Sequence, residues 1–209
     1  PLPNPYDEAA GPDAVNAGLD AAFARATQER GSVDTLVNCA GSVKTAPFLK
    51  MGNDVWEALW RTNVMGAVNA TRAVLPAMRE LPAGRIINIA STASLKGYAY
   101  VSAYTATKHA LLGMTRALAT ELAGTAITVN AICPGYVWTP LVEQQIEAQA
   151  KSHNIARDAV IRDVFLKNQP TKRFATIEEM GALAVFLSGD LAGSITGAAI
   201  PVDGGWTAH

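Results

Sequence analysis

The stretch SAYTATKHALLG, residues 102 to 113, places Tyr104 four residues before Lys108 in a segment with helical character. Residues four apart on a helix lie on one face, so the lysine ammonium can reach the phenol. A tyrosine ordinarily loses its proton near pH ~10, and a neighbouring cation stabilises the phenolate and lowers that pKa. Tyr104 is therefore a candidate general acid or base near neutral pH. The alternative is an ordinary helix with an exposed lysine and a half-buried tyrosine.

Two other polar residues could take part in the same chemistry. Ser91 closes the run IINIAS at a predicted strand end, where its hydroxyl can hydrogen-bond a substrate oxygen. Asn63 lies inside the helical segment LWRTNVMG, and because asparagine is a poor helix-interior residue we expect it to cap, to kink the helix or to bind water. The plain alternatives are a strand-end turn residue for Ser91 and a solvated helix position for Asn63.

The elements that must position these residues alternate between short β-branched runs and longer segments of helical periodicity. Strands are predicted over 35–41, 84–91, 126–135 and 197–205, and helices over 13–30, 53–79, 102–123 and 176–189. Because the apolar runs lack polar alternation, each strand should be covered on both faces. We therefore expect an α/β fold, a parallel sheet flanked by helices with right-handed crossovers, in one domain over residues 1–209.

Composition limits the class of protein. The chain has 209 residues, 49% of them hydrophobic, and a net charge of −1, which suits one soluble domain. Its basic residues are dispersed, so we expect neither nucleic-acid nor membrane binding. The apolar runs are short, and residues 1–11 lack the features of a signal peptide, so the expected location is the cytoplasm. Cys39 and Cys133 lie in strand-like runs without metal-binding spacing, which predicts two buried thiols and no metal site.

The set of motifs, taken together, resembles the short-chain dehydrogenase/reductase family. The matching elements follow the family's order and usual spacing: NCAG at 38–41, Asn63, Ser91, YTATK at 104–108, CPGYVWTP at 133–140 and VDGGW at 202–206. The resemblance covers nearly all of the chain from about residue 13 onward. It implies a Rossmann-like, doubly wound sheet and an NAD(P)-dependent oxidoreductase that interconverts a secondary alcohol and a ketone.

The same resemblance implies a catalytic tetrad of Asn63, Ser91, Tyr104 and Lys108. Ser91 would hold the carbonyl or alcohol oxygen, and Tyr104 would exchange the proton. Lys108 would lower the pKa of the tyrosine and bind the nicotinamide ribose, while Asn63 would hold a water in the proton relay. The hydride itself belongs to the cofactor.

Cofactor contacts are implied mainly at strand ends. They are Asn38, Ala40, Gly41, Tyr104, Lys108, Pro134, Gly135, Val137 and Thr139. Small residues at 40–41 would let the adenosine half approach the backbone, the Val137 backbone would face the nicotinamide, and Thr139 would reach the carboxamide or pyrophosphate. The expected cofactor is NAD or NADP, with NAD slightly preferred.

One departure from the family pattern is large. The family begins with a strand and a glycine-rich turn that cradles the pyrophosphate, yet the sequence contains no GxxxGxG-like segment. About three strands and two helices, roughly 50 residues or more, would then be missing at the N-terminal side. The strand at 35–41 would present an apolar edge. A non-catalytic truncated family member is therefore an open alternative.

Substrate class must be inferred from the C-terminal part, which resembles the D-3-hydroxybutyrate dehydrogenase branch of the family. The implied substrate contacts are Ser91, Ala93, Tyr104, Tyr136, Gln145 and Trp206. Where that branch grips a carboxylate with polar residues, this chain has Val43, Ala93 and Val101. Since hydrogen bonds to charged groups are worth roughly 1.5 to 3 kcal/mol each, we expect a less polar ketone or alcohol, or a 3-oxoacyl compound. Lys44 could replace that grip or simply be solvated, and a D-3-hydroxybutyrate-type hydroxy acid dehydrogenase is the alternative.

The polar segment 140–175 is predicted to form two short amphipathic helices over the substrate crevice. Their apolar positions are Leu141, Val142, Ile146, Val160, Ile161, Val164 and Phe165. Few contacts should tie these helices to the sheet, so they would act as a lid with Gln145 facing substrate. A rigid surface excursion is the alternative.

Family resemblance also implies a homodimer or homotetramer that pairs the helices at 53–79 and 102–123. Leu111, Leu112 and Leu118 are expected on the outer face of the second helix, where they would give this pairing a hydrophobic reason. The alternative is that they face the sheet of their own subunit.

Overall fold

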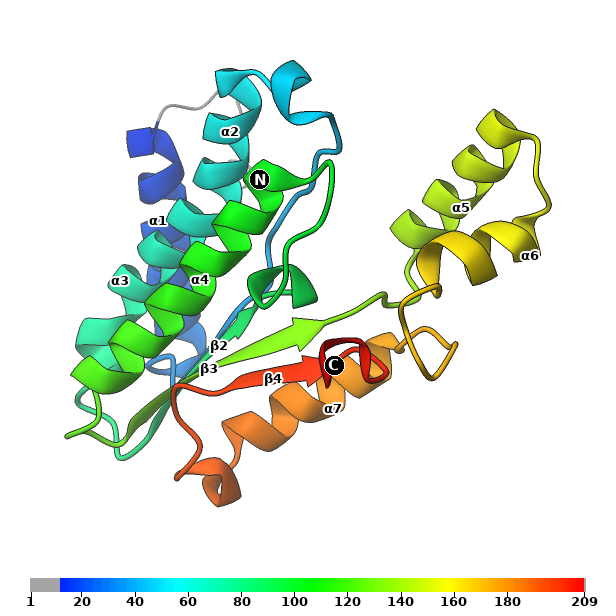
Figure 1. Ribbon diagram of the computed structural model, residues 1–209. Coiled ribbons are helices and arrows are strands. Elements are labelled where there is room, and N and C mark those ends of the chain that lie inside the picture. Colours follow the sequence, from blue (N-terminus) through cyan, green and yellow to red (C-terminus); the bar gives the residue numbers. More distant parts are fainter. Residues whose placement is uncertain (1–11, 209) are drawn as a thin grey trace.

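A computed structural model describes residues 12–208 and shows an all-parallel sheet with helices on both faces (Figure 1). Its four strands lie side by side in chain order: β1 Thr35–Asn38, β2 Gly84–Ile89, β3 Ile127–Pro134 and β4 Ala199–Val202. All the predicted strands are confirmed, each somewhat shorter than expected. Residues 1–11, on which the expectation about a signal peptide rested, lie outside the described residues.

The predicted helices are also confirmed, with one interruption. The α-helices are α1 Pro12–Arg30, α2 Asn53–Trp60, α3 Gly66–Met78, α4 Ser102–Glu121, α5 Pro140–His153, α6 Arg157–Val160 and α7 Ile177–Ser188. The segment predicted as one helix over 53–79 is divided by a π-helical turn at Arg61–Met65. None of the described helices combines the length and the apolar character needed to cross a bilayer.

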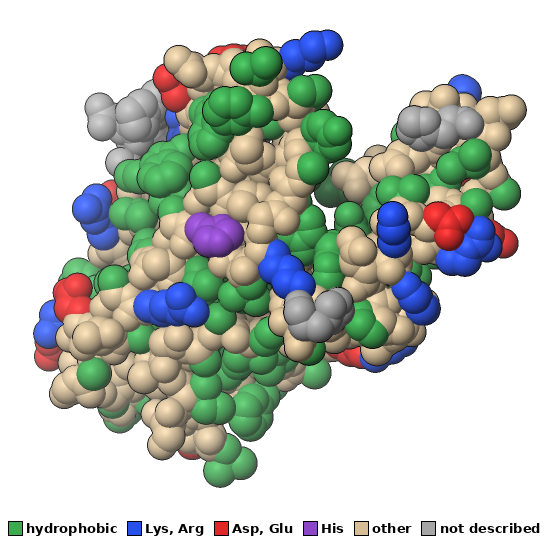
Figure 2. Space-filling view, viewed as in Figure 1, with side chains coloured by type: hydrophobic (Ala, Val, Ile, Leu, Met, Phe, Trp, Pro, Cys, Tyr) green, Lys and Arg blue, Asp and Glu red, His purple; other side chains and the backbone are tan. Residues whose placement is uncertain are grey.

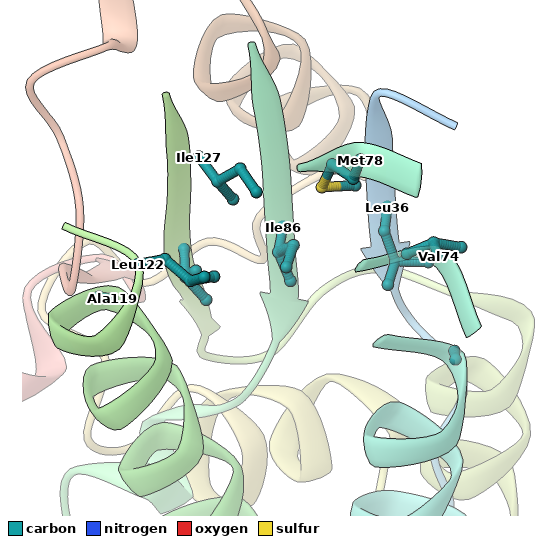
Figure 3. Close-up of a cluster of buried hydrophobic side chains, with 9 residues drawn as sticks. Leu36, Val74, Met78, Ile86, Ala119, Leu122 and Ile127 are labelled. Carbon is teal, nitrogen blue, oxygen red and sulfur yellow. The ribbon is translucent and has the colours of Figure 1, made fainter. Parts of the chain in front are cut away.

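The two faces of the sheet bury different side chains, as the doubly wound arrangement requires. Ile86 of β2 and Val129 of β3 face α3 and α4, in a cluster with Val74, Met78 and Leu122 (Figure 3). On the opposite face Ile87 and Ile132 pack with Leu187 of α7. Successive residues of one strand thus enter two cores, which explains why the strands lack polar alternation.

Strand β1 forms one edge of the sheet, as expected. Val37 is 43% exposed, and Cys39 just beyond the strand is exposed as well. The prediction of two buried thiols is therefore confirmed for Cys133 and wrong for Cys39. Cys133 lies on β3 between two neighbouring strands, whereas no described strand covers the outer side of β1.

The leucines expected on the outer face of α4 pack inward instead. Leu111 and Leu112 are 2% and 3% exposed and belong to the core cluster that includes Ala131 on β3. Leu118 is partly buried against the adjoining cluster. The outward placement is therefore wrong, because α4 covers β3 with this apolar stripe. The outer side of α4 carries His109 and Arg116.

The segment 140–175 forms α5, α6 and a π-helical turn at Ile161–Phe165, which confirms the two predicted helices. Figure 1 shows these helices projecting beyond the carboxyl end of β3, and we call residues 140–165 the arm. Ile146, Val160 and Phe165 form a cluster of their own. Leu141 and Val164 are 58% and 45% exposed, so the predicted apolar stripe is wrong at these two positions.

Candidate active site

Tyr104 and Lys108 lie side by side at the beginning of α4, next to the carboxyl end of β2. The Lys108 Nζ atom is 5.7 Å from the centroid of the Tyr104 ring. It donates a 2.8 Å hydrogen bond to the carbonyl of Ile89, the last residue of β2. Lys108 is only 4% exposed, so the alternative of an ordinary solvated lysine is wrong. The predicted pairing on one helix face is confirmed.

Ser91 follows β2 and caps the short 3₁₀ turn Thr92–Ser94. Its Oγ accepts a 3.1 Å hydrogen bond from the Ala93 backbone N–H, which leaves the hydroxyl proton free to be donated. That proton can be directed to the phenol oxygen of Tyr104, whose pKa the Ser91 hydroxyl acts to lower. Ala93, a predicted substrate contact, is 2% exposed, and its backbone N–H is used by Ser91.

Burial determines the protonation of both central groups. It lowers the pKa of Lys108 to about 8, although the nearby thiols of Cys39 and Cys133 act in the opposite direction. It raises the pKa of Tyr104, and the Ser91 hydroxyl opposes that rise. The expectation of a tyrosine pKa lowered by Lys108 is therefore wrong for this structure. The desolvation of the phenol outweighs its polar neighbours, and the ammonium is directed at the Ile89 carbonyl.

Asn63 lies within the π-helical turn that separates α2 from α3 and is 1% exposed. Its Oδ1 accepts from the Ser42 N–H at 2.8 Å, and its Nδ2 donates to the Ser42 carbonyl at 2.9 Å and to Thr107 Oγ1 at 3.0 Å. Asn63 thus lies where the regular α-helix is interrupted, by a π-helical turn and not by the expected side-chain cap, and the solvated alternative is wrong. Both of its N–H groups bind protein atoms, so the side chain fastens the loop that follows β1.

Gly41 lies against two members of the predicted tetrad. A Cβ atom at this position would be 3.3 Å from Asn63 Oδ1 and 3.5 Å from Lys108 Nζ, so glycine permits this close approach. Ala40 is exposed beside it. Asn38 points elsewhere: its Nδ2 donates to Asn88 Oδ1 at 2.8 Å and ties β1 to β2. Of the three predicted cofactor contacts after β1, Ala40 and Gly41 are the two that offer open backbone.

The backbone of Val137 is oriented by a short parallel bridge with Ala175. The Trp138 N–H donates to the Ala175 carbonyl at 2.9 Å, and the Ala175 N–H donates to the Tyr136 carbonyl at 3.0 Å. Since alternate peptide groups of an extended chain point in opposite directions, the N–H and C=O of Val137 face away from Ala175. They are available to a ligand at this position.

The other predicted cofactor contacts at and after the end of β3 have structural roles. Pro134 is the last residue of β3. A Cβ atom on Gly135 would lie 3.0 Å from the Cα of Asp203, so this glycine permits close packing of the C-terminal loop. Thr139 caps α5 by accepting a 3.2 Å hydrogen bond from the Val142 N–H. Its hydroxyl proton is still free to donate to a ligand.

Aromatic side chains join the C-terminus to the arm. Trp206 is 8% exposed and stacks on Tyr136 with ring centroids 5.8 Å apart. Tyr136 also contacts Phe165 of the arm at 4.9 Å, and Tyr98 meets Trp206 edge-on at 5.0 Å. Trp206 and Tyr136, both predicted substrate contacts, are thus brought together, whereas Gln145 is half-buried on α5.

Sequence reasoning missed Tyr98 and Thr107. The Tyr98 hydroxyl donates to Thr92 Oγ1 at 2.8 Å. Tyr98 also lies close enough to Tyr104 for the two phenols to affect each other electrostatically. Thr107 is fully buried and bonds to Asn63, a role that its place inside the YTATK motif could have suggested. Among residues 12–208, no group of three or more His, Cys, Asp or Glu side chains is arranged to hold a metal ion.

These residues fit a nicotinamide cofactor. Gly41 and the Val137 backbone leave room and hydrogen-bonding groups, and Lys108 has three ammonium protons for the single acceptor, Ile89, found in the described part of the chain. A buried ammonium with unused donors suits the hydroxyl groups of a ribose.

Comparison with known proteins agrees with this arrangement. A sequence model of the family described as Enoyl-(Acyl carrier protein) reductase matches residues 14–207. D-beta-hydroxybutyrate dehydrogenase of Rhizobium meliloti (strain 1021) is 44% identical over 179 residues, which are 86% of this chain and 69% of that protein. Acetoacetyl-CoA reductase of Shinella zoogloeoides is 40% identical and matched over 88% of this chain and 71% of its own.

Comparison with solved structures also agrees with this arrangement. L-sorbose reductase from Gluconobacter frateurii, complexed with NADPH and L-sorbose, has a TM-score of 0.85 and 32% identity to this chain. The match covers 90% of this chain and 72% of the reductase. From the family model, the relatives and the shared fold, the chain belongs to the short-chain dehydrogenase/reductase family, whose members are NAD(P)-dependent oxidoreductases of alcohols and ketones.

Proposed function

We propose that this protein interconverts a secondary alcohol and a ketone through Asn63, Ser91, Tyr104 and Lys108. The observation that carries the proposal is the buried Lys108 ammonium 5.7 Å from the Tyr104 ring, with Ser91 beside the phenol. An ammonium without a carboxylate partner is costly to bury, and strongly perturbed groups of this kind concentrate at functional sites. A merely structural position would be served better by an apolar side chain.

The protonation states suit reduction of a ketone at neutral pH. Burial raises the pKa of Tyr104, so the phenol keeps its proton and can donate it to the carbonyl oxygen. Ser91 can donate a hydrogen bond to the same oxygen. With its pKa at about 8, Lys108 is mainly charged at neutral pH and stabilises the phenolate that remains. A bound nicotinamide cofactor would supply or accept the hydride.

Gly41, Lys108, Val137 and Thr139 are the residues that we expect to hold the nicotinamide half of the cofactor. NAD and NADP are both compatible with them, and the slight preference for NAD rests on the sequence alone. The L-sorbose reductase structures, in contrast, contain NADPH. Titration of the full-length protein with each cofactor, followed by nicotinamide fluorescence, tests this part of the proposal. A protein that binds neither would instead be the non-catalytic family member.

For the substrate we propose a less polar ketone or alcohol, or a 3-oxoacyl compound. The side chains of Ala93 and Val43 are apolar, so neither offers a polar grip for a carboxylate. Trp206 and Tyr136 supply stacked aromatic surface nearby. The second candidate is D-3-hydroxybutyrate, because of the 44% identity to a D-beta-hydroxybutyrate dehydrogenase. Comparing kcat/KM for acetoacetate with that for its ethyl ester and its thioester decides, and we expect the neutral compounds to be preferred about tenfold.

Assembly into a homodimer or homotetramer, in the cytoplasm, completes the proposal. Since Leu111 and Leu112 are buried within the subunit, other surfaces must supply the hydrophobic area. On and after α7, Val185 is 72% exposed and Leu191 is 92% exposed. Light scattering of the full-length protein at micromolar concentration gives the assembly state, and a monomer would contradict this part.

A further inference from the structure

Thr107 lies between Tyr104 and Lys108 on α4 and is 0% exposed. Its hydroxyl donates a 2.7 Å hydrogen bond to the Tyr104 carbonyl, within its own helix. Its oxygen accepts a 3.0 Å hydrogen bond from Asn63 Nδ2. A threonine hydroxyl has one proton, and this proton is committed to Tyr104, so only lone pairs remain for the asparagine.

We infer that Thr107 is a positioning residue for the reaction, an inference that rests on the proposed function. Because Thr107 offers Asn63 only an acceptor, the nitrogen of the Asn63 amide must face it. The amide oxygen is thereby directed to the Ser42 N–H, at 2.8 Å. A reversed amide would place its NH₂ group against the Ser42 N–H, two donors facing each other in a buried site. The Ser42 carbonyl requires the same orientation, because it accepts from Asn63 Nδ2 at 2.9 Å, and Thr107 therefore reinforces the way in which Asn63 binds the loop after β1.

That loop contacts the reacting groups. Gly41, next to Ser42, approaches Asn63 and Lys108 so closely that an added Cβ would lie 3.3 Å and 3.5 Å from their polar atoms. A displaced loop would change the surroundings of the Lys108 ammonium, whose state depends on burial. The hydroxyl of Thr107 is thus connected to the chemistry through Asn63 and Ser42, without touching a reacting atom itself.

The same helix contains a matched control. Thr115 is also 0% exposed, donates to the Leu111 carbonyl at 2.9 Å and accepts from Asn88 Nδ2 at 2.9 Å. Its burial and hydrogen bonds copy those of Thr107, yet its direct partners lie outside the tetrad. Asn88 continues to Asn38, a candidate cofactor contact, so turnover should be compared at saturating cofactor.

Thr107→Val, Thr107→Ser and Thr115→Val can be compared in the full-length protein. Two properties are measured: the exchange rate of the Ser42 amide hydrogen by NMR, without cofactor, and the pH dependence of kcat. Thr107→Val should speed Ser42 exchange at least about tenfold, lower kcat about tenfold and shift its apparent pKa, because the Asn63 amide loses one of the three hydrogen bonds that hold it and a buried N–H is left without an acceptor. Thr107→Ser should keep the exchange rate, kcat and the apparent pKa near their wild-type values.

Thr115→Val should lower the melting temperature about as much as Thr107→Val and leave Ser42 exchange and the kcat profile unchanged. Equal effects of both valine variants on exchange and profile would reduce Thr107 to a structural residue and overturn the inference. Tyr104→Phe is measured in parallel. If Tyr104→Phe keeps its activity, the proposed function fails. If Tyr104→Phe is inactive and Thr107→Val behaves as wild type, the positioning role alone is wrong.

Discussion

The beginning of α4 and the arm of residues 140–165 are stabilised by opposite kinds of interaction. In α4, Thr107 and Lys108 are buried polar groups, and each is hydrogen-bonded to a different element of the fold. In the arm, Ile146 and Phe165 belong to an apolar cluster formed largely within the segment, while Arg157 makes exposed ion pairs with the same segment. The candidate catalytic groups are thus bonded to other elements of the fold, whereas the contacts of the arm lie largely within it.

Aromatic side chains nevertheless join the arm to the body. Tyr136 contacts Phe165 on the arm side and stacks on Trp206 on the body side. Figure 2 shows a notch between the arm and the body, with hydrophobic side chains around it. Closure of the arm over the site stays a prediction, which hydrogen exchange can test.

The largest effect is expected from a substitution in α4. Tyr104→Phe should lower kcat by about 10³-fold or more, because it removes the proton that is transferred and keeps the ring that packs beside Lys108. Cofactor affinity should change by less than about threefold. Steady-state rates and a cofactor titration measure both. Retention of most of the wild-type kcat would end the assignment of the tetrad.

Lys108→Met should lower kcat about 100-fold and, at neutral pH, stabilise the protein. The folded-state pKa of Lys108 is about 8 and its unfolded value is 10.5, so the unfolded chain binds more protons between these pH values. Wild-type stability therefore rises with pH across that window, as the cost of the buried charge disappears. The variant should be more stable by up to about 3 kcal/mol below pH 8, with the difference vanishing by pH 10.5.

Urea denaturation at several pH values measures this difference. A variant less stable than wild type at pH 7 would show that the ammonium is not costly to bury. For the wild type, kcat/KM should fall as pH rises through about 8, since the ammonium is then lost. Lys151→Met changes an exposed lysine of α5 and serves as the control for removal of a positive charge.

Hydrogen exchange tests how readily the arm opens compared with the sheet. Amides of the arm should exchange at least about tenfold faster than those of Gly84–Ile89 in β2, because few elements pack on the arm. Cofactor together with a substrate analogue should slow the arm selectively. An arm already as protected as β2, and unchanged by ligands, would be the rigid excursion.

The smallest effect is expected from Gln145→Ala. Gln145 is half-buried on α5, whereas its neighbour Gln144 is exposed and provides a matched control. Loss of a substrate contact in the closed arm should raise KM about threefold to tenfold and change kcat less. Equal behaviour of the two variants would remove Gln145 from the substrate site.

The positions of strands and helices could be predicted because both follow from hydrophobic periodicity within a short window. Periodicity shows that Leu111 and Leu112 share a helix face, yet it cannot say whether a sheet or a second subunit covers that face. The exposure of Cys39 was missed for a similar reason, since a strand-like sequence does not show whether another strand lies beside it.

At the site, the family resemblance implied the tetrad, which stays a prediction, and spacing predicted that Tyr104 and Lys108 lie side by side. The raised pKa of Tyr104 could not be foreseen, because burial, its largest cause, depends on residues distant in sequence. The partners of Asn63 were missed for the same reason: Ser42 and Thr107 approach it only in the folded chain.

The π-helical turn at Arg61–Met65 changes the number of residues in this helical stretch. Such a turn accommodates one more residue than the α-helical turns on either side, so it is equivalent to a single-residue insertion in a longer helix. Deleting that residue would give a smoother helix from 53 to 78, but every later side chain would rotate by about 100° relative to α2. Asn63 would then turn away from Ser42. Because of the extra residue, one continuous stretch of chain can present its side chains in two rotations about the helix axis. One rotation places the core side chains of α3, and the other places the Asn63 amide at the site.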